Sequence, residues 1–228
     1  MNASGTYASP PCMAAEVDPA YFDPLATDPQ QARDVARWRR AERIRLAGLR
    51  VALGQGGRAR VSDAIAAHLE GVLSTREARR GTILSGYWPI RGEPDLRPLL
   101  AALHHAGVII VLPVVEVRAA PLVFRRWTPE TKMVRGDWNI PVPPSDAEAL
   151  TPDVMLAPCL GWDGGCYRLG WGGGYFDRTL AALAPRPVAI GIALSAARLN
   201  TIYPQPHDMP LDLIVTETGP LAERETWP

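Results

Sequence analysis

The sequence PCLGWDGGCYRLGWGGGYFDRTLAAL, residues 158–183, decides which fold the chain adopts. An apolar run at residues 154–160 leads into it. Its middle holds glycine at four of five consecutive positions, namely Gly170, Gly172, Gly173 and Gly174. Aromatic and apolar residues then follow at helical spacing, namely Tyr175, Phe176, Leu180 and Leu183. This order predicts a strand, a tight loop and a helix.

The loop between the predicted strand and helix has the composition of a phosphate-binding site. Glycines let backbone N–H groups converge on a ligand, and the helix that follows adds unpaired N–H groups and its positive dipole end. Arg168 and Arg178 flank the glycines with fixed positive charge, and Asp177 is the one acid among them. A phosphate ligand with a divalent cation is one interpretation of this pattern, and a turn without a ligand is the other.

Several familiar motifs are absent from the sequence. No Gly-Lys-Ser/Thr string exists, so the loop is not a Walker A loop. A dinucleotide fingerprint that began at Gly170 would need glycine where Tyr175 stands. No Gly-x-Ser-x-Gly elbow and no zinc spacing of histidine and cysteine occurs, and the four histidines are expected on surfaces or helix ends. We therefore expect no catalytic nucleophile from the protein.

Length and composition limit the class of protein. The chain has 228 residues and no formal net charge. We expect one domain over residues 29–228, after a disordered or loosely docked tail at residues 1–28 that lacks apolar periodicity. Balanced charge and the lack of a long apolar run give no reason to expect nucleic-acid or membrane binding. Three cysteines without a metal or disulfide pattern, and no secretory signal, favour a cytoplasmic location.

Apolar periodicity predicts an alternation of helices and strands along the chain. Two helices are expected first, one over residues 29–53 and one capped by Ser62. The later segments are a strand at 82–87, a helix at 94–106, strands at 108–112 and 122–127, an extended loop at 138–144, a βαβ unit over 154–194 and a last strand at 211–216. This order predicts a three-layer α/β/α domain with a mainly parallel central sheet.

Two acids occur where ligands bind in such a fold. Asp177 follows the glycines, and Asp208 lies just before the last predicted strand. Carboxylates from loops at the carboxyl ends of parallel strands can share a Mg²⁺ that also touches phosphate oxygens. Capping of a turn is an equally good interpretation for Asp208, and Glu93 fits either a loop acid or the start of a helix.

The string RLGWGGGYFDR, which begins at Arg168, resembles the signature of 5-formyltetrahydrofolate cyclo-ligases, also called methenyltetrahydrofolate synthetases. That family carries Arg-Leu-Gly-x-Gly-x-Gly-Tyr-(Tyr or Phe)-Asp after a segment similar to residues 158–163 here. Residues 93–96, 138–141 and 208–212 resemble further segments of the family, with Pro94 and Leu96 as departures. The resemblance extends over residues 33–217, which is most of the chain.

The resemblance implies a role for each matched residue. On the first helix it implies ATP contacts from Arg39 and Arg43, with Arg37 as a competitor for the first position. In the loop it implies ATP binding by Arg168, Leu169, Gly170, Trp171, Gly172, Gly173, Gly174 and Tyr175. It implies substrate contacts from Glu93, Trp138 and Tyr175. It implies Mg²⁺ binding by Asp177 and Asp208.

The chemistry implied by the family needs no protein nucleophile. ATP phosphorylates the formyl oxygen of 5-formyltetrahydrofolate, the substrate's own N10 attacks the activated carbon, and phosphate leaves to give 5,10-methenyltetrahydrofolate. Such phosphoryl transfer requires positioning, Mg²⁺ and positive charge. Aromatic walls for the pterin and benzoyl rings are expected from Tyr87, Trp88, Trp138 and Tyr175.

The implied partners are 5-formyltetrahydrofolate and ATP, without nucleic acid or membrane, and the protein is expected to act as a monomer. Two alternatives stay open. One is a family member that uses ATP on another small formyl or carboxyl substrate, since the sequence departs from the family beside Glu93. The other is a non-catalytic module that binds nucleic acid through its basic first helix, against which the zero net charge and the presence of Arg168 and Asp177 argue.

Deletion of residues 1–28 is expected to leave enzymatic turnover and the melting temperature nearly unchanged, because this segment lacks the periodicity of a packed element. The measurement compares the truncated and full-length proteins in the same assay and the same thermal melt. A large loss in either quantity would show that the segment docks on the domain.

Overall fold

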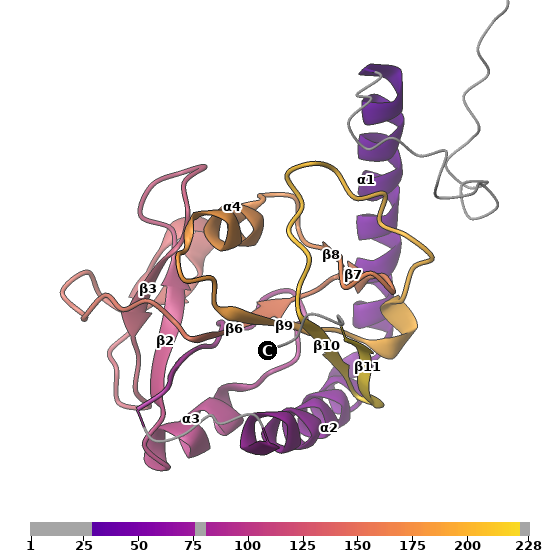
Figure 1. The fold of residues 1–228 in the computed structure, drawn as a ribbon. Coiled ribbons are helices and arrows are strands. Elements are labelled where there is room, and N and C mark those ends of the chain that lie inside the picture. Colours follow the sequence, from indigo (N-terminus) through magenta and orange to yellow (C-terminus); the bar gives the residue numbers. More distant parts are fainter. Residues whose placement is uncertain (1–28, 76–80, 224–228) are drawn as a thin grey trace, which may run out of the picture.

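The apolar runs of the chain form one central sheet in the computed structural model, which describes residues 29–75 and 81–223 (Figure 1). Within those residues the sheet has seven strands in the order β11-β10-β9-β6-β1-β2-β3. Their bounds are β1 (Ile83–Ser85), β2 (Ile109–Val114), β3 (Val123–Arg126), β6 (Val154–Pro158), β9 (Val188–Ile192), β10 (Leu213–Thr216) and β11 (Gly219–Glu223). The five inner strands, from β10 to β2, pair in parallel, and the two edge strands pair antiparallel. The predicted mainly parallel sheet is confirmed.

Helices cover both faces of the sheet, so the predicted three-layer architecture is also confirmed (Figure 1). The helices are α1 (Pro29–Ala52), α2 (Gly54–Thr75), α3 (Arg97–His105) and α4 (Tyr175–Ala182). Leu46 of α1 and Leu180 of α4 belong to one apolar cluster. Ile65 of α2 and Leu100 of α3 belong to the other. Adjacent strand residues divide between these clusters, as the alternation of side chains along a strand requires.

The predicted βαβ unit is present and carries an additional hairpin. Strand β6 pairs in parallel with β9, and α4 lies between them in the chain. Between β6 and α4, β7 (Gly161–Trp162) and β8 (Arg168–Leu169) form an antiparallel pair that the sequence analysis did not predict. The buried Asp163 holds the hairpin turn, because its Oδ1 accepts the N–H groups of Gly165 and Tyr167 at 3.0 and 3.2 Å. The hairpin therefore delivers Arg168 to a fixed place at the start of the glycine loop.

The start of the second helix and the end of the sheet differ from the sequence prediction. The second helix begins at Gly54 and not at Ser62, because Gly54 makes the turn alone with a φ of +62°. Ser62 lies inside α2, where its hydroxyl donates to the carbonyl of Arg58 at 2.8 Å. The predicted last strand is followed by β11, whose sequence GPLAE lacks the alternation typical of a strand.

The predicted extended loop at residues 138–144 is only partly extended. Trp138 and Asn139 have φ values of 53° and 62° in a short 3₁₀ turn, η3 (Asp137–Asn139). The chain is extended only after this turn, where β5 (Pro141–Val142) pairs with β4 (Val134–Arg135). The predicted tail at residues 1–28 lies outside the described residues. Within the described part of the chain, no helix has the length and hydropathy needed to cross a bilayer.

A close contact in β9 gives a test of the packing on one face of the sheet. A Cβ at Gly191 would lie 2.5 Å from Cδ1 of Ile214 and 2.7 Å from Cδ1 of Leu211. Gly191→Ala is therefore expected to lower the free energy of unfolding by roughly 1–3 kcal/mol, as overpacking of a core does. The control is Gly48→Ala in α1, where nothing lies within 4 Å of the added carbon. It is expected to raise the same quantity by about 0.5–1 kcal/mol.

Urea unfolding of both variants measures the two free energies. Equal stability of the wild type and Gly191→Ala would contradict the packing described here.

Candidate active site

A cavity of about 550 Å³ opens beside the carboxyl ends of β1, β2 and β6. This is the edge of a parallel sheet where ligands bind. The cavity is lined by every residue to which the sequence analysis gave a binding role, namely Arg39, Arg43, Glu93, Trp138, Arg168, Leu169, Gly170, Trp171, Gly172, Gly173, Gly174, Tyr175, Asp177 and Asp208. The structure thus brings together residues that are up to 169 positions apart in the chain. Their individual roles stay predictions.

The glycine loop fits closely around two arginines. Gly172 has a φ of +100°, and its missing Cβ would lie 3.4 Å from Cζ of Arg43. A Cβ at Gly170 would lie 2.6 Å from Nη1 of Arg168. Gly174 begins α4 with a φ of 64°. Glycine therefore favours the turn at Gly172 and Gly174 and leaves room for the two guanidinium groups.

Two arginines of α1, one helical turn apart, reach the cavity. Arg43 donates from Nε to the carbonyl of Gly170 at 2.8 Å, and Arg39 donates from Nη2 to the carbonyl of Tyr203 at 2.8 Å. Burial beside Arg39 lowers the pKa of Arg43 below its ordinary value. Arg37 is 76% exposed at its side chain and pairs with Asp34. Its position excludes Arg37 from the cavity and leaves Arg39 as the match to the expected basic position.

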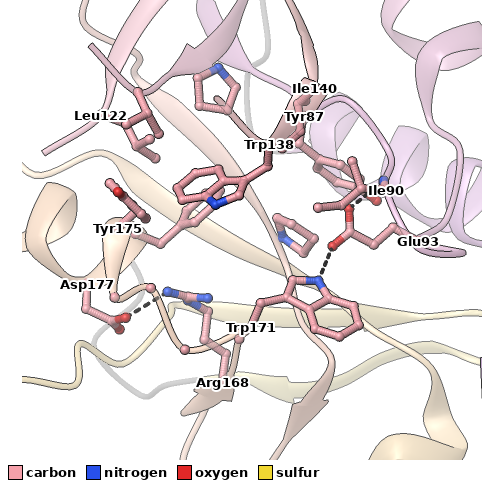
Figure 2. A pocket seen from close by; sticks show the side chains of 18 of the residues that line it. Tyr87, Ile90, Glu93, Leu122, Trp138, Ile140, Arg168, Trp171, Tyr175 and Asp177 are labelled. Atoms are coloured by element: carbon pink, nitrogen blue, oxygen red, sulfur yellow. Dashed lines mark hydrogen bonds and ion pairs between the residues drawn. The ribbon is translucent and has the colours of Figure 1, made fainter. Parts of the chain in front are cut away.

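Each of the two candidate metal ligands is paired with an arginine. Asp177 accepts from Nη2 of Arg168 at 2.8 Å, and Asp208 pairs with Arg39 (Figure 2 shows the first pair). Asp177 also accepts the backbone N–H of Met209 at 3.3 Å, so the two acids lie near each other. No group of three or more acidic, histidine or cysteine side chains suited to a metal occurs in residues 29–75 and 81–223. Two carboxylates fit Mg²⁺ where phosphate oxygens and water supply its other ligands.

Arg168 is buried and has spare capacity to donate hydrogen bonds. Its Nε has no hydrogen-bond partner within the described residues, and its guanidinium lies 4.9 Å from the ring centroid of Phe176. A buried donor without a partner costs free energy that a ligand oxygen would recover. This geometry suits an anionic ligand at the start of the glycine loop.

Glu93 lies across the cavity from Asp177 and is 7% exposed (Figure 2). Its Oε1 accepts from Nε1 of Trp171 at 3.1 Å, and its Oε2 accepts the N–H of Ile90 at 3.0 Å. Burial raises the pKa of this carboxyl above its ordinary value, and the N–H of Ile90 and the charge of Arg50 oppose the rise. Trp171 therefore joins the glycine loop to the acid that the sequence analysis placed in the substrate site.

Arg50, whose side chain is 2% exposed beneath this acid, was missed by the sequence analysis. A signal for it exists in the sequence, because Arg50 follows Arg43 by seven residues, which is two helical turns. That spacing places both side chains on one face of α1.

Aromatic side chains form part of the cavity wall, as expected. Trp138 is 62% exposed, and its ring meets that of Tyr175 edge to face at 5.6 Å. Trp88 and Tyr87 also line the cavity, and the buried hydroxyl of Tyr87 donates to the carbonyl of Pro94 at 2.8 Å. The positive φ of Trp138 is a strained conformation of the kind found at functional sites.

The cysteines and the histidine near the cavity are not placed to act as a nucleophile or a base. Cys159 and Cys166 are both buried. Burial raises the pKa of Cys159 to about 12, so its thiol stays protonated at neutral pH. His207 lines the cavity with a side chain that is 76% exposed. None of these groups is arranged as an activated nucleophile with a base.

Comparison with known proteins identifies relatives of this chain. A sequence model of the 5-formyltetrahydrofolate cyclo-ligase family matches residues 35–217. The chain is 32% identical over 179 residues to the 5-formyltetrahydrofolate cyclo-ligase of Mycolicibacterium smegmatis, an alignment that covers 74% of this chain and 91% of that protein. It is 31% identical over 131 residues to the enzyme of that name from Escherichia coli, over 55% of this chain and 72% of that protein.

Solved structures with the same fold include two methenyltetrahydrofolate synthetases. The NMR structure of 5,10-methenyltetrahydrofolate synthetase from Aquifex aeolicus matches with a TM-score of 0.70 at 25% identity, over 83% of this chain and 95% of that chain. The 5,10-methenyltetrahydrofolate synthetase from Mycoplasma pneumoniae matches with a TM-score of 0.64 at 23% identity, over 78% of this chain and 98% of that chain, which supports the fold alone.

Proposed function

The chain belongs to the 5-formyltetrahydrofolate cyclo-ligase family, and from this premise we propose that it converts 5-formyltetrahydrofolate to 5,10-methenyltetrahydrofolate with consumption of MgATP and release of ADP and phosphate. One observation carries the proposal. A glycine loop bordered by arginines and a buried carboxylate face the same cavity, and the hydrogen bond from Trp171 to Glu93 joins them. Such a cavity can hold a polyphosphate and a neutral ring system side by side.

In this proposal the phosphate groups of ATP lie along the glycine loop. Backbone N–H groups of residues 170–174 and the guanidinium groups of Arg39, Arg43 and Arg168 supply donors and positive charge. Before ATP binds, Asp208 and Asp177 pair with Arg39 and Arg168 and so hold both guanidinium groups in place. Charged donors fixed in advance stabilise the transition state of phosphoryl transfer more than donors that must reorganise. Mg²⁺ held by the two aspartates would offset charge on the phosphate oxygens.

The folate substrate takes the other half of the cavity. The Glu93 carboxylate accepts hydrogen bonds from ring N–H groups of the pterin, and the rings of Trp138 and Tyr175 pack against its faces. The formyl oxygen then attacks the γ-phosphorus of ATP, the bond from that phosphorus to the β–γ bridging oxygen breaks, and ADP leaves. N10 of the substrate next attacks the formyl carbon, the carbon–oxygen bond to phosphate breaks, and N10 loses its proton. The protein's part is to align the reacting groups and to exclude water.

The proposal is tested with purified protein, 5-formyltetrahydrofolate and MgATP. The absorbance of 5,10-methenyltetrahydrofolate is expected to appear together with ADP and phosphate, and EDTA is expected to abolish it. Product that forms equally well without ATP would contradict the proposal. If the protein turned over ATP with a different small formyl or carboxyl compound and not with the folate, it would be a family member that acts on another substrate.

Loss of Arg168 is expected to weaken ATP binding more than folate binding. A charge-assisted hydrogen bond contributes roughly 1.5–3 kcal/mol, and about 1.4 kcal/mol is a factor of ten, so Arg168→Ala should raise the KM for ATP by roughly ten- to a hundred-fold. Folate affinity measured without nucleotide should change little. Arg37→Ala, on the exposed side of α1, is the control and should leave both quantities unchanged.

Loss of the charge on Asp177 is expected to act through the metal. Asp177→Asn should lower turnover and shift the Mg²⁺ dependence to higher concentration, again with little change in folate affinity. Melting temperatures of the variants show whether each protein is folded. Folded variants of Arg168 and Asp177 with unaltered ATP and Mg²⁺ dependence would refute the assignment of both residues.

A further inference from the structure

A buried arginine lies behind the cavity wall and has no role in the account given so far. Arg50, near the end of α1, is 1% exposed and does not line the cavity. Its Nη2 donates to the carbonyl of Cys159 at 2.5 Å. Its Nε and Nη1 have no hydrogen-bond partner within the described residues. A guanidinium stays charged when buried, so a nearby carboxylate is required to offset its desolvation.

The carboxylate that meets this requirement is that of Glu93. Nη1 of Arg50 lies 3.9 Å from Oε1 of Glu93, and the two side chains are 2% and 3% exposed. The distance is too long for a hydrogen bond, so Arg50 acts on Glu93 as a charge. In low-dielectric surroundings a charge at this distance interacts strongly. The hydrogen bonds to Glu93 come from Trp171 and the N–H of Ile90.

The other groups around Glu93 cannot take the place of Arg50. Tyr87 follows β1 and Cys159 follows β6, and burial raises the pKa of both, so they are neutral. Arg91, on the same loop as Glu93, is exposed, and its guanidinium lies 4.8 Å from the ring centroid of Trp171. Water and salt screen an exposed charge. Arg50 is therefore the buried cation that faces the acid.

We propose that Arg50 is a positioning residue that keeps Glu93 ionised and aimed into the cavity as a hydrogen-bond acceptor, although Arg50 itself touches no ligand. The inference deepens the proposed function and, for the identity of the ligand, rests on it. Burial favours the protonated form of Glu93, and a protonated carboxyl loses acceptor capacity and negative charge. Without Arg50, the acid would take up a proton at a higher pH than in the wild type and, once neutral, would bind ring N–H groups weakly.

The first test needs no ligand. The indole N–H of Trp171 donates to Glu93, so its NMR resonance reports the charge of the acid. The resonance is assigned by its loss in Trp171→Phe. On titration with acid, the resonance in Arg50→Met is expected to move with a midpoint at higher pH than in the wild type, because the charge that favours the ionised carboxylate is gone. Arg50→Lys, which retains the charge, should resemble the wild type. Equal midpoints in Arg50→Met and the wild type would overturn the proposal.

The second test measures turnover against pH at saturating MgATP. In Arg50→Met the KM for 5-formyltetrahydrofolate is expected to rise as the pH falls, by about tenfold or more at the acidic end of the profile, and to recover toward the wild-type value at alkaline pH, with the KM for ATP unchanged. The control is Arg45→Met on the same helix, where the arginine is half-exposed and pairs with Glu42. It should match the wild type throughout. A KM for the folate that is raised equally at every pH would show a merely structural role and overturn the proposal.

Melting temperatures give a further test, which keeps the proposal testable even if Arg50→Met alone fails to fold. Glu93→Gln leaves the charge of Arg50 buried without a partner, so it should lower the melting temperature, and the double variant Arg50→Met/Glu93→Gln should recover part of the loss. No recovery would contradict the pairing. A wild type that makes no methenyltetrahydrofolate would refute the proposed function alone, because the indole resonance and the melting temperatures judge the role of Arg50 without substrate.

Discussion

Three guanidinium groups, those of Arg39, Arg50 and Arg168, are buried at one end of the sheet. Each faces a carboxylate, and these carboxylates belong to Asp208, Glu93 and Asp177 respectively. The first two come from distant segments of the chain, whereas Asp177 is nine residues from Arg168. An unpaired charge in such a place would cost several kcal/mol, so the three pairs have to form together with the fold. The first two pairs tie α1 to the segment before β10 and to the loop after β1, and the third joins the two ends of the glycine loop. Hydrogen bonds from Arg43 to Gly170 and from Trp171 to Glu93 attach that loop to the other segments. The cavity exists where these four segments meet.

The first helix has a larger part in the site than its position at the edge of the fold indicates (Figure 1). Arg39 and Arg43 reach the cavity and Arg50 reaches the acid behind its wall. One straight helix with basic residues four and seven positions apart thus contacts the glycine loop, the 203–208 segment and Glu93. Its apolar residue Leu46 fixes the helix against Gly161 of the β7–β8 hairpin, where a side chain would collide with it. This packing therefore sets how far the three arginines of α1 lie from their partners in the site.

Local sequence patterns were enough to predict the parallel sheet and the crossover around the glycine loop, whereas most of the residues that line the cavity were assigned from the resemblance to a family. Glycines with positive φ and apolar β-branched runs act over a few positions, so they are visible in the sequence. The start of α2 was wrong because a single residue, Gly54, makes the turn. Arg50 and its pairing with Glu93 were missed because the two residues are 43 positions apart in the chain and their pairing depends on how α1 packs.

The hydrogen bond from Trp171 to Glu93 has a thermodynamic consequence. Trp171 belongs to the glycine loop, so a nucleotide that shifts the loop must also alter one of the two acceptor oxygens offered to the second ligand. Linkage is reciprocal: whatever factor the first ligand imposes on the affinity of the second, the second imposes on the first. Under the proposed function, the 3.1 Å contact would therefore couple the two halves of the cavity, and the sign of the coupling would set the preferred order of binding.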